Sequence, residues 1–206
     1  PTAFDNLPQI TISAWVNPKS AGEGGFGRIV EKADGATSPT ARGWNLFITG
    51  TNQLVFTADF ASTNLDKRSS VSTLTLNQWQ HVAVTWDGSS AKTGARLYVN
   101  GNEVSYATNQ SGSGTRVLDG IEDLRIGNNE SGSRTFDGGI DEVKIYNRVL
   151  TQTEIQDDIN SLPKPLTLTK PNGGEKWQLG DTHTILWTPY DPVLGINPAN
   201  TEVTAY

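Results

Sequence analysis

The sequence predicts an all-β protein, folded as a two-sheet antiparallel sandwich of jelly-roll type with one short helix at its C-terminal end. Up to Tyr146, segments of four to eight residues rich in Ile, Val, Thr, Phe, Tyr and Trp recur between clusters of Gly, Asn, Asp and Ser. Such spacing is typical of strands joined by turns. Short hairpins without helical crossovers favour a sandwich or jelly roll over a parallel sheet.

The clearest strand signal is the alternation in segment 80–86, where every second residue is apolar. Successive side chains of a strand point to opposite faces, so one face of this strand packs inward and the other is a platform of small and polar groups. The inward face holds Val82, Val84 and Trp86, and the platform holds His81, Ala83 and Thr85.

The best-defined turn is Asn100-Gly101, which lies between two alternating runs. A type I′ hairpin needs positive φ at both central positions, and Asn-Gly is the pair that accepts this most readily. The pattern as a whole predicts strands at Ile10–Val16, Gly27–Lys32, Trp44–Ile48, Gln53–Asp59, Ser70–Thr73, Trp79–Asp87, Ala95–Val99, Asn102–Ala107, Leu124–Gly127 and Gly138–Tyr146. We expect Val82, Val84, Val143 and Ile145 to be buried.

The one helix signal begins at Thr151, where Thr151 and Glu154 form a capping box ahead of Ile155 and Ile159. Two prolines follow in Ser161–Pro165, and a strand pattern then restarts. We therefore expect a domain at 1–160, a linker at 161–165 and a second β unit at 166–206. Because 41 residues rarely bury an independent core, we expect this second unit to be truncated.

Composition excludes several classes of function. The 206 residues carry 16 Lys and Arg against 22 Asp and Glu, a net charge of −6, which disfavours binding to nucleic acid. Apolar runs are far shorter than the roughly 20 residues of a membrane span, and the absence of Cys rules out thiol chemistry. The sequence has no Met and begins with Pro1, so we expect an excised or processed piece of a longer chain.

Four motifs resemble the laminin-G-like (LamG-like jelly-roll) domains of the concanavalin A-like lectin/glucanase superfamily. They read ITISAWVNP, WQHVAVTWDG, LYVNG and FDGGIDEVKIYNRVL, and they occupy Ile10–Pro18, Trp79–Gly88, Leu97–Gly101 and Phe136–Leu150. The resemblance covers roughly residues 1–160. It implies two curved antiparallel sheets, often a structural calcium, and use as a carbohydrate- or protein-binding module. Family members usually carry further strands before the first motif, so we expect such strands to lie outside this chain or the sandwich to be completed otherwise.

A structural calcium would be held by carboxylate and carbonyl oxygens. Asp141 is the first candidate ligand because it ends the loop that enters the last strand. Asp5 is the second, because it lies where the family's calcium ligands often fall. The alternative for Asp141 is a plain corner role, with its carboxylate accepting backbone N–H groups.

The C-terminal unit is similar to the opening of bacterial immunoglobulin-like surface domains. The pattern that carries this likeness is Pro-Asn-Gly-Gly-Glu at 171–175, followed by Trp177, Gly180, Ile185 and Trp187. It implies a multi-domain extracellular protein.

Catalysis is disfavoured by the placement of the acidic residues. The superfamily's glucanases place carboxylates at alternate positions of one strand, whereas Glu122-Asp123 and Asp141-Glu142 are adjacent doublets whose members point to opposite faces. The two histidines, His81 and His183, accompany no serine nucleophile motif.

Glycan binding needs an aromatic platform together with amides and charged groups that bond sugar hydroxyls. The loop at 127–134 supplies the polar part, and the loop at 59–64 supplies a ring and an amide; the alternative for each is a solvated loop without a partner. Trp15, Trp79 and Trp86 are assigned to core packing. The candidate ligand residues are Phe60, Asn64, Asn128, Asn129, Glu130 and Arg134.

The sequence thus predicts a monomeric, non-catalytic carbohydrate-binding module of a secreted or surface-bound bacterial protein, with a polysaccharide or glycan as partner. The alternative is a structural or adhesive surface domain that binds a cell-surface protein or spaces other domains.

Overall fold

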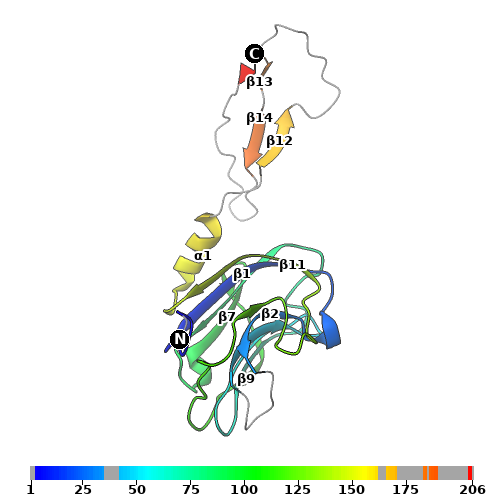
Figure 1. Ribbon diagram of the computed structural model, residues 1–206. Helices are drawn as coiled ribbons and strands as arrows, with labels where there is room; N and C mark the ends of the chain where they lie inside the picture. Colours follow the sequence, from blue (N-terminus) through cyan, green and yellow to red (C-terminus); the bar gives the residue numbers. More distant parts are fainter. Residues whose placement is uncertain are drawn as a thin grey trace. The chain divides into compact units, whose positions relative to one another are not determined.

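The computed structural model describes residues 3–34, 42–161, 166–170, 183–184, 186–189 and 204–205, with side chains described as far as residue 160 (Figure 1). The chain divides into two units, Pro1–Asn160 and Ser161–Tyr206. None of the helices in the described ranges is long and apolar enough to span a membrane.

The first unit is an antiparallel sandwich of two sheets, as the sequence predicts. The first sheet has the order β11-β1-β6-β7-β8. Its strands are β1 (Ile10–Pro18), β6 (Gln80–Trp86), β7 (Ala95–Val99), β8 (Asn102–Glu103) and β11 (Gly138–Tyr146). The central strand β6 pairs with β1 on one side and with β7 on the other.

The second sheet has the order β10-β2-β3-β4-β5-β9. Its strands are β2 (Arg28–Ala33), β3 (Gly43–Ile48), β4 (Leu54–Ala58), β5 (Leu65–Ser69), β9 (Tyr106–Gln110) and β10 (Arg125–Ile126). Two short 3₁₀ turns, η1 (Glu23–Gly25) and η2 (Lys92–Gly94), lie in the connections.

Two predicted strands are wrong. The predicted strand Asn102–Ala107 is divided between β8 of the first sheet and β9 of the second. Ser70–Thr73 forms a turn, and the strand is β5 just before it. Three consecutive charged residues, 66–68, hide the strand from a search for apolar alternation. Lys67 takes the buried central position, with its ammonium 4.0 Å from the centroid of the Tyr106 ring and 2.8 Å from the Asn109 Oδ1 that accepts its hydrogen bond. A lysine with a satisfied ammonium can serve as a core residue through its aliphatic stem.

The core fills the space between the two sheets. Val82 and Val84 are buried there as expected, whereas Val143 and Ile145 are only partly buried because β11 is an edge strand. The largest fully buried side chains of the core are Ile10, Ile12, Ile29, Trp44, Leu46, Ile48, Leu54, Phe56, Leu65, Leu74 and Trp86.

The outer face of the first sheet is partly covered by α1 (Gln152–Ser161), which Figure 1 shows beside β1 and β11. Ala83, Tyr98, Leu150 and Ile155 form a second apolar cluster at this contact. The platform predicted from His81, Ala83 and Thr85 is therefore buried.

The predicted capping box of α1 is present. Glu154 N–H donates to Thr151 Oγ1 at 3.2 Å, and Thr151 N–H donates to Glu154 Oε2 at 2.8 Å. Two N-terminal donors are thereby satisfied reciprocally.

The Asn100-Gly101 turn also has the predicted geometry, with φ of 49° and 75°. Its tip is covered, because Gln152 and Gln156 of α1 donate to the Gly101 carbonyl at 3.0 and 3.1 Å. A Cβ at Gly101 would lie 2.7 Å from Gln156 Cγ. The hairpin thus also anchors the helix.

In the second unit, β12 (Leu166–Lys170) pairs with β14 (Leu186–Pro189), and β13 (His183–Thr184) pairs with β15 (Thr204–Ala205), both antiparallel. Residues 162–165 of the predicted linker and most of the immunoglobulin-like pattern, including Trp177, lie outside the described residues.

Gly101→Val should lower the free energy of unfolding by about 1 kcal/mol or more, because a β-branched residue resists positive φ and its Cβ would displace Gln156. Gly50→Val is the matched control, since a Cβ at Gly50 meets nothing within 4 Å. Urea titration of both variants measures the difference. Equal stability of the two would contradict this account of the turn.

Candidate functional site

The loop at 127–135 is tied to the edge of the second sheet. Gly127 N–H donates to the Ile29 carbonyl at 3.1 Å, and Arg28 N–H donates to the Arg134 carbonyl at 2.9 Å. The two ends of the loop are therefore fixed against β2, and its side chains are presented beside that strand.

The side chains of the two asparagines of this loop form hydrogen bonds within the loop itself. Asn128 Oδ1 accepts from the N–H groups of Asn129 and Arg134 at 2.8 and 3.0 Å. Asn129 is only 9% exposed, and its Oδ1 accepts from Ser133 N–H at 2.8 Å. These side chains, expected from the sequence as ligand contacts, hold the loop in shape.

Glu130 and Arg134 are the two predicted residues that present charge at the surface of the loop. Glu130 is exposed, and its Oε1 lies 3.6 Å from Arg125 Nη2. The Arg134 guanidinium lies over the ring of Phe26, 5.0 Å from its centroid. Phe26 is itself 40% exposed, so a ring and a guanidinium are presented together.

This pair continues onto the outer face of the second sheet. The rings of Phe26 and Phe47 have centroids 6.2 Å apart, and the Arg28 guanidinium lies 4.5 Å from the centroid of Phe47. We call Phe26, Arg28, Phe47 and Arg134 the arginine–phenylalanine cluster. Of the four, only Arg134 is predictable from the sequence, because the others lie more than 85 positions before it and belong to no motif.

A buried carboxylate supports the cluster. Glu31 is fully buried on β2, where its Oε2 accepts from Arg28 Nε at 2.6 Å and its Oε1 accepts from Glu130 N–H at 3.2 Å. A charge-assisted bond of this kind fixes the arginine strongly. Glu31 therefore joins the sheet, the loop and the guanidinium in one network.

The other predicted ligand residues lie elsewhere. Phe60 and Asn64 belong to the β4–β5 connection, whereas the loop at 127–135 flanks β2. Phe60 is 4% exposed and packs edge-on against Trp86, with centroids 6.4 Å apart. This burial argues against the stacking role expected for its ring. Asn64 Oδ1 accepts from Phe60 N–H at 3.2 Å, so this amide shapes its own turn.

The metal candidates do not come together as a site. The carboxylate of Asp5 lies 2.9 Å from the buried Lys32 ammonium, which takes the place a cation would need. Asp141 is exposed, and its Oδ1 accepts from Glu142 N–H at 2.8 Å, which is the corner role considered as the alternative. Within the described residues, no group of three His, Cys, Asp or Glu side chains is arranged to hold a metal ion.

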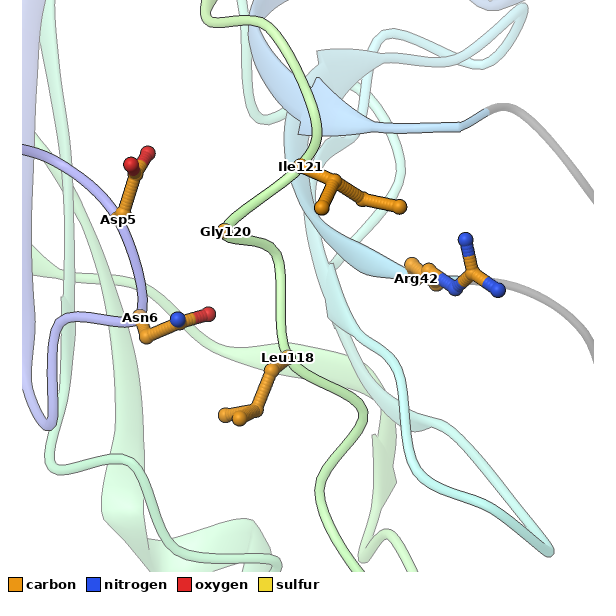
Figure 2. A pocket seen from close by; sticks show the side chains of 6 residues that line it. All are labelled: Asp5, Asn6, Arg42, Leu118, Gly120 and Ile121. Carbon is orange, nitrogen blue, oxygen red and sulfur yellow. The ribbon is translucent and has the colours of Figure 1, made fainter. Parts of the chain in front are cut away.

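An open pocket of about 490 Å³ lies near Asp5, between the N-terminal segment and the segment at 118–121 (Figure 2). Figure 2 shows Asn6 and Leu118 extending into the same space, with Arg42 beyond Gly120 and Ile121. Leu118 and Ile121 are strongly exposed. The pocket therefore combines exposed apolar side chains with one guanidinium.

A two-sheet antiparallel sandwich that presents polar loops is the architecture of lectin-type domains. Residues 2–156 match the Laminin_G_3 family model of the concanavalin A-like lectin/glucanases superfamily. The chain belongs to this family. A search of curated proteins found no match.

Solved structures support the same fold. The CBM40 of Ruminococcus gnavus IT-sialidase bound to α2,3-sialyllactose has a TM-score of 0.53 at 17% identity, over 74% of this chain and 82% of that chain. A putative carbohydrate binding protein from Bacteroides ovatus ATCC 8483 has a TM-score of 0.51 at 22% identity, over 76% of this chain and 42% of that chain. The binding domain of Botulinum Neurotoxin DC in complex with SialylT has a TM-score of 0.52 at 16% identity, over 76% and 36%. This chain therefore spans less than half the length of the last two.

The stability of the protein should depend on pH through Asp59, which lies in the β4–β5 connection. Burial, reinforced by the charges of Asp34 and Glu31, raises the pKa of Asp59 from 3.8 to about 7. Folding therefore favours the protonated carboxyl, and this stabilisation is complete below pH 3.8 and lost as the pH rises through 7.

An asparagine cannot ionise, so Asp59→Asn should keep this stabilisation as the pH rises. Its free energy of unfolding should rise relative to that of the wild type between about pH 4 and pH 7 and then level off. Urea titrations across this range measure the difference. A difference that stays constant with pH would show that Asp59 does not titrate as described.

Proposed function

We propose that residues 1–160 form a non-catalytic carbohydrate-binding module of a secreted or cell-surface, multi-domain bacterial protein, and that the module acts as a monomer. The glycan would lie across the arginine–phenylalanine cluster and the adjoining Glu130. The observation that carries this proposal is the Arg134 guanidinium held over the exposed ring of Phe26.

The chemistry of this surface suits a sugar. The exposed part of Phe26 can contact the C–H face of a pyranose ring. The guanidinium of Arg134 and the carboxylate of Glu130 supply a donor and an acceptor for hydroxyl groups beside it. Glu31 accepts from Glu130 N–H and Asn128 accepts from Arg134 N–H, so the backbone that carries these two charged groups is fixed in advance. Less ordering is therefore needed when a ligand binds.

The non-catalytic assignment is supported by the acidic residues as well. Glu122 lies 3.8 Å from Arg42 Nη1, and Asp123 lies 3.2 Å from Arg125 Nη2. The two neighbours are therefore in separate ion pairs rather than paired across one cleft. The similar solved structures include a CBM40 module with bound sialyllactose, which supports sugar binding on a fold of this class.

The affinity of a single module should be low. An open surface with few contacts corresponds to a micromolar to millimolar dissociation constant, or about −4 to −8 kcal/mol. Tandem modules in a longer protein would raise retention by avidity without new contacts.

A second candidate function is that of an adhesive surface domain that binds another protein. The pocket at Leu118 and Ile121 favours it, because exposed apolar side chains beside Arg42 are typical of protein contacts. Under this alternative the polar loops at 59–64 and 127–135 would be exposed to solvent and would bind no ligand.

Arg134→Ala should abolish retention on an immobilised glycan, because it removes the donor that lies over Phe26. Stability should change by no more than about 0.5 kcal/mol, as for other surface substitutions. Arg96→Ala is the matched control, since Arg96 is an exposed arginine of β7 paired with Glu103. Affinity electrophoresis and a glycan array measure the effect. Retention of Arg134→Ala at the wild-type level would remove the loop from the proposed site.

Asn129→Ala is not an equivalent test. Its side chain is nearly buried and bonds Ser131 and Ser133. Loss of binding in this variant could therefore arise from a changed loop shape.

Calcium binding stays a prediction of the family resemblance, and Asp141 is the residue that tests it. If calcium binds only the folded protein, a hundredfold excess over the dissociation constant adds about 2.7 kcal/mol to stability. Differential scanning fluorimetry with calcium and with a chelator should show this shift in the wild type and in the surface control Asp157→Ala, but not in Asp141→Ala. An unchanged melting temperature on chelation would leave Asp141 with its corner role.

A further inference from the structure

The part of the first sheet's outer face that holds Trp15 and Asn17 contains unpaired polar atoms. Among the residues whose side chains are described, four buried side-chain polar atoms have no hydrogen-bond partner: Trp15 Nε1, Asn17 Oδ1, Trp44 Nε1 and His81 Nδ1. Three of these four atoms lie on this one face. Trp15 pairs with His81 in the β1–β6 ladder, and Trp15 and Asn17 share the face because they are two positions apart.

Buried polar atoms without partners are rare and costly. Each destabilises the folded protein if nothing compensates it. Three in adjacent positions mark a place where the fold keeps hydrogen-bonding capacity for something other than its own side chains.

An indole lies beside these atoms. Trp79, just before β6, is 50% exposed, although the sequence assigned it to the core. A Cβ on Gly139 would lie 2.7 Å from Trp79 Cη2 and 3.0 Å from Cζ2. Since β1 lies between β6 and β11, the indole crosses β1 near Asn17, the ladder partner of Gly139. Gly139 thus leaves the space in which the ring lies against the sheet.

A carboxylate completes the surface. Asp141 is exposed and pairs with Trp15 in the β1–β11 ladder, so its side chain lies on the same face. The Trp15 and His81 rings meet edge-on with centroids 5.7 Å apart. The surface therefore offers a flat indole and an acceptor carboxylate, and beneath them lie a buried indole N–H and a buried amide oxygen with no protein partner.

We propose that Trp79, together with Asn17, Trp15 and Asp141, forms a second sugar subsite that binds a neutral pyranose unit of a glycan. The pyranose stacks on the exposed face of Trp79, and Asp141 accepts its hydroxyl hydrogens. Asp141 and the neighbouring Glu142 place negative charge here, which disfavours acidic sugars. The arginine–phenylalanine cluster on the other sheet carries the opposite charge.

This subsite rests on the proposed function, since it is a second point of attachment for a carbohydrate ligand. It deepens that function by giving the module two binding surfaces on the outer faces of opposite sheets. The core of the sandwich separates the two surfaces. A substitution in one surface should therefore leave the other surface unchanged.

The test is a glycan array that carries neutral and sialylated oligosaccharides, probed with the full 206-residue chain. Trp79→Ala should weaken binding to neutral glycans by about tenfold or more, the range expected for loss of a stacked ring. Trp79→Phe should recover part of this binding. Val71→Ala removes an exposed apolar side chain that lies outside both surfaces, so it should leave binding to neutral glycans unchanged.

A purely structural role for Trp79 is distinguished by a second readout. Neutral oligosaccharides should protect the wild type from quenching of tryptophan fluorescence by acrylamide, and this protection should be absent in Trp79→Phe. Gly139→Ala covers the case in which Trp79→Ala fails to fold, because the added methyl group displaces the indole while the ring is retained; it should lose neutral-glycan binding too.

Three outcomes overturn the inference, and they do so differently. If the wild type binds neutral glycans and both Trp79→Ala and Gly139→Ala bind them equally well, the subsite is wrong while the proposed function stands. If Trp79→Ala only lowers the melting temperature and the wild type shows no protection from acrylamide, the tryptophan is structural. If the wild type binds no glycan at all, the proposed function itself fails.

Discussion

The architecture depends on burial of the central strand β6 from both sides. All seven of its residues are buried, with Val82, Val84 and Trp86 in the core between the sheets. The other side is covered near Ala83 by α1 and the segment before it. Burial on both sides at about 25 cal/mol per Å² makes a change of register in this strand very costly, because a slip of one residue exchanges the two faces. The strand therefore fixes the positions of α1, of the Asn100-Gly101 hairpin and of Trp79, which directly precedes the strand.

A second constraint is electrostatic, and it organises the opposite sheet. Glu31 has no exposure, so its charge must be compensated within the protein. It is compensated by Arg28 and by the N–H of Glu130, which ties the loop at 127–135 to β2. The same bond orients the Arg28 guanidinium over Phe47. A buried acid thus positions the Arg28 guanidinium and the backbone of the loop that carries Glu130 and Arg134.

Local patterns in the sequence predicted local structure well. The Asn100-Gly101 turn and the capping box of α1 follow from backbone preferences of a few neighbouring residues, and both are confirmed. The two-sheet fold follows from alternation and turn spacing. The strand β5 was missed because its central buried residue is Lys67, which imitates an apolar residue only once Tyr106 and Asn109 are in place.

The candidate site was predictable only in part, because it is assembled by long-range contacts. Arg134 and Glu130 could be read from a polar loop, but Phe26 reaches Arg134 only through the pairing of distant segments. Exposure was equally hidden: Phe60 is buried in the core and Trp79 lies on the surface, although both are aromatic residues near strand ends. Which aromatic residue is exposed depends on what the other sheet and the helix cover.

The most direct measurement of the central claim is an NMR titration of the isotope-labelled chain with a sialylated glycan that it retains. The account predicts that the largest amide shifts fall at Phe26, Phe47 and residues 127–135, with the core of β6 unaffected. Shifts confined to Asn6, Leu118 and Ile121, or the absence of any shift at millimolar glycan, would contradict the assignment of the arginine–phenylalanine cluster as the carbohydrate-binding surface.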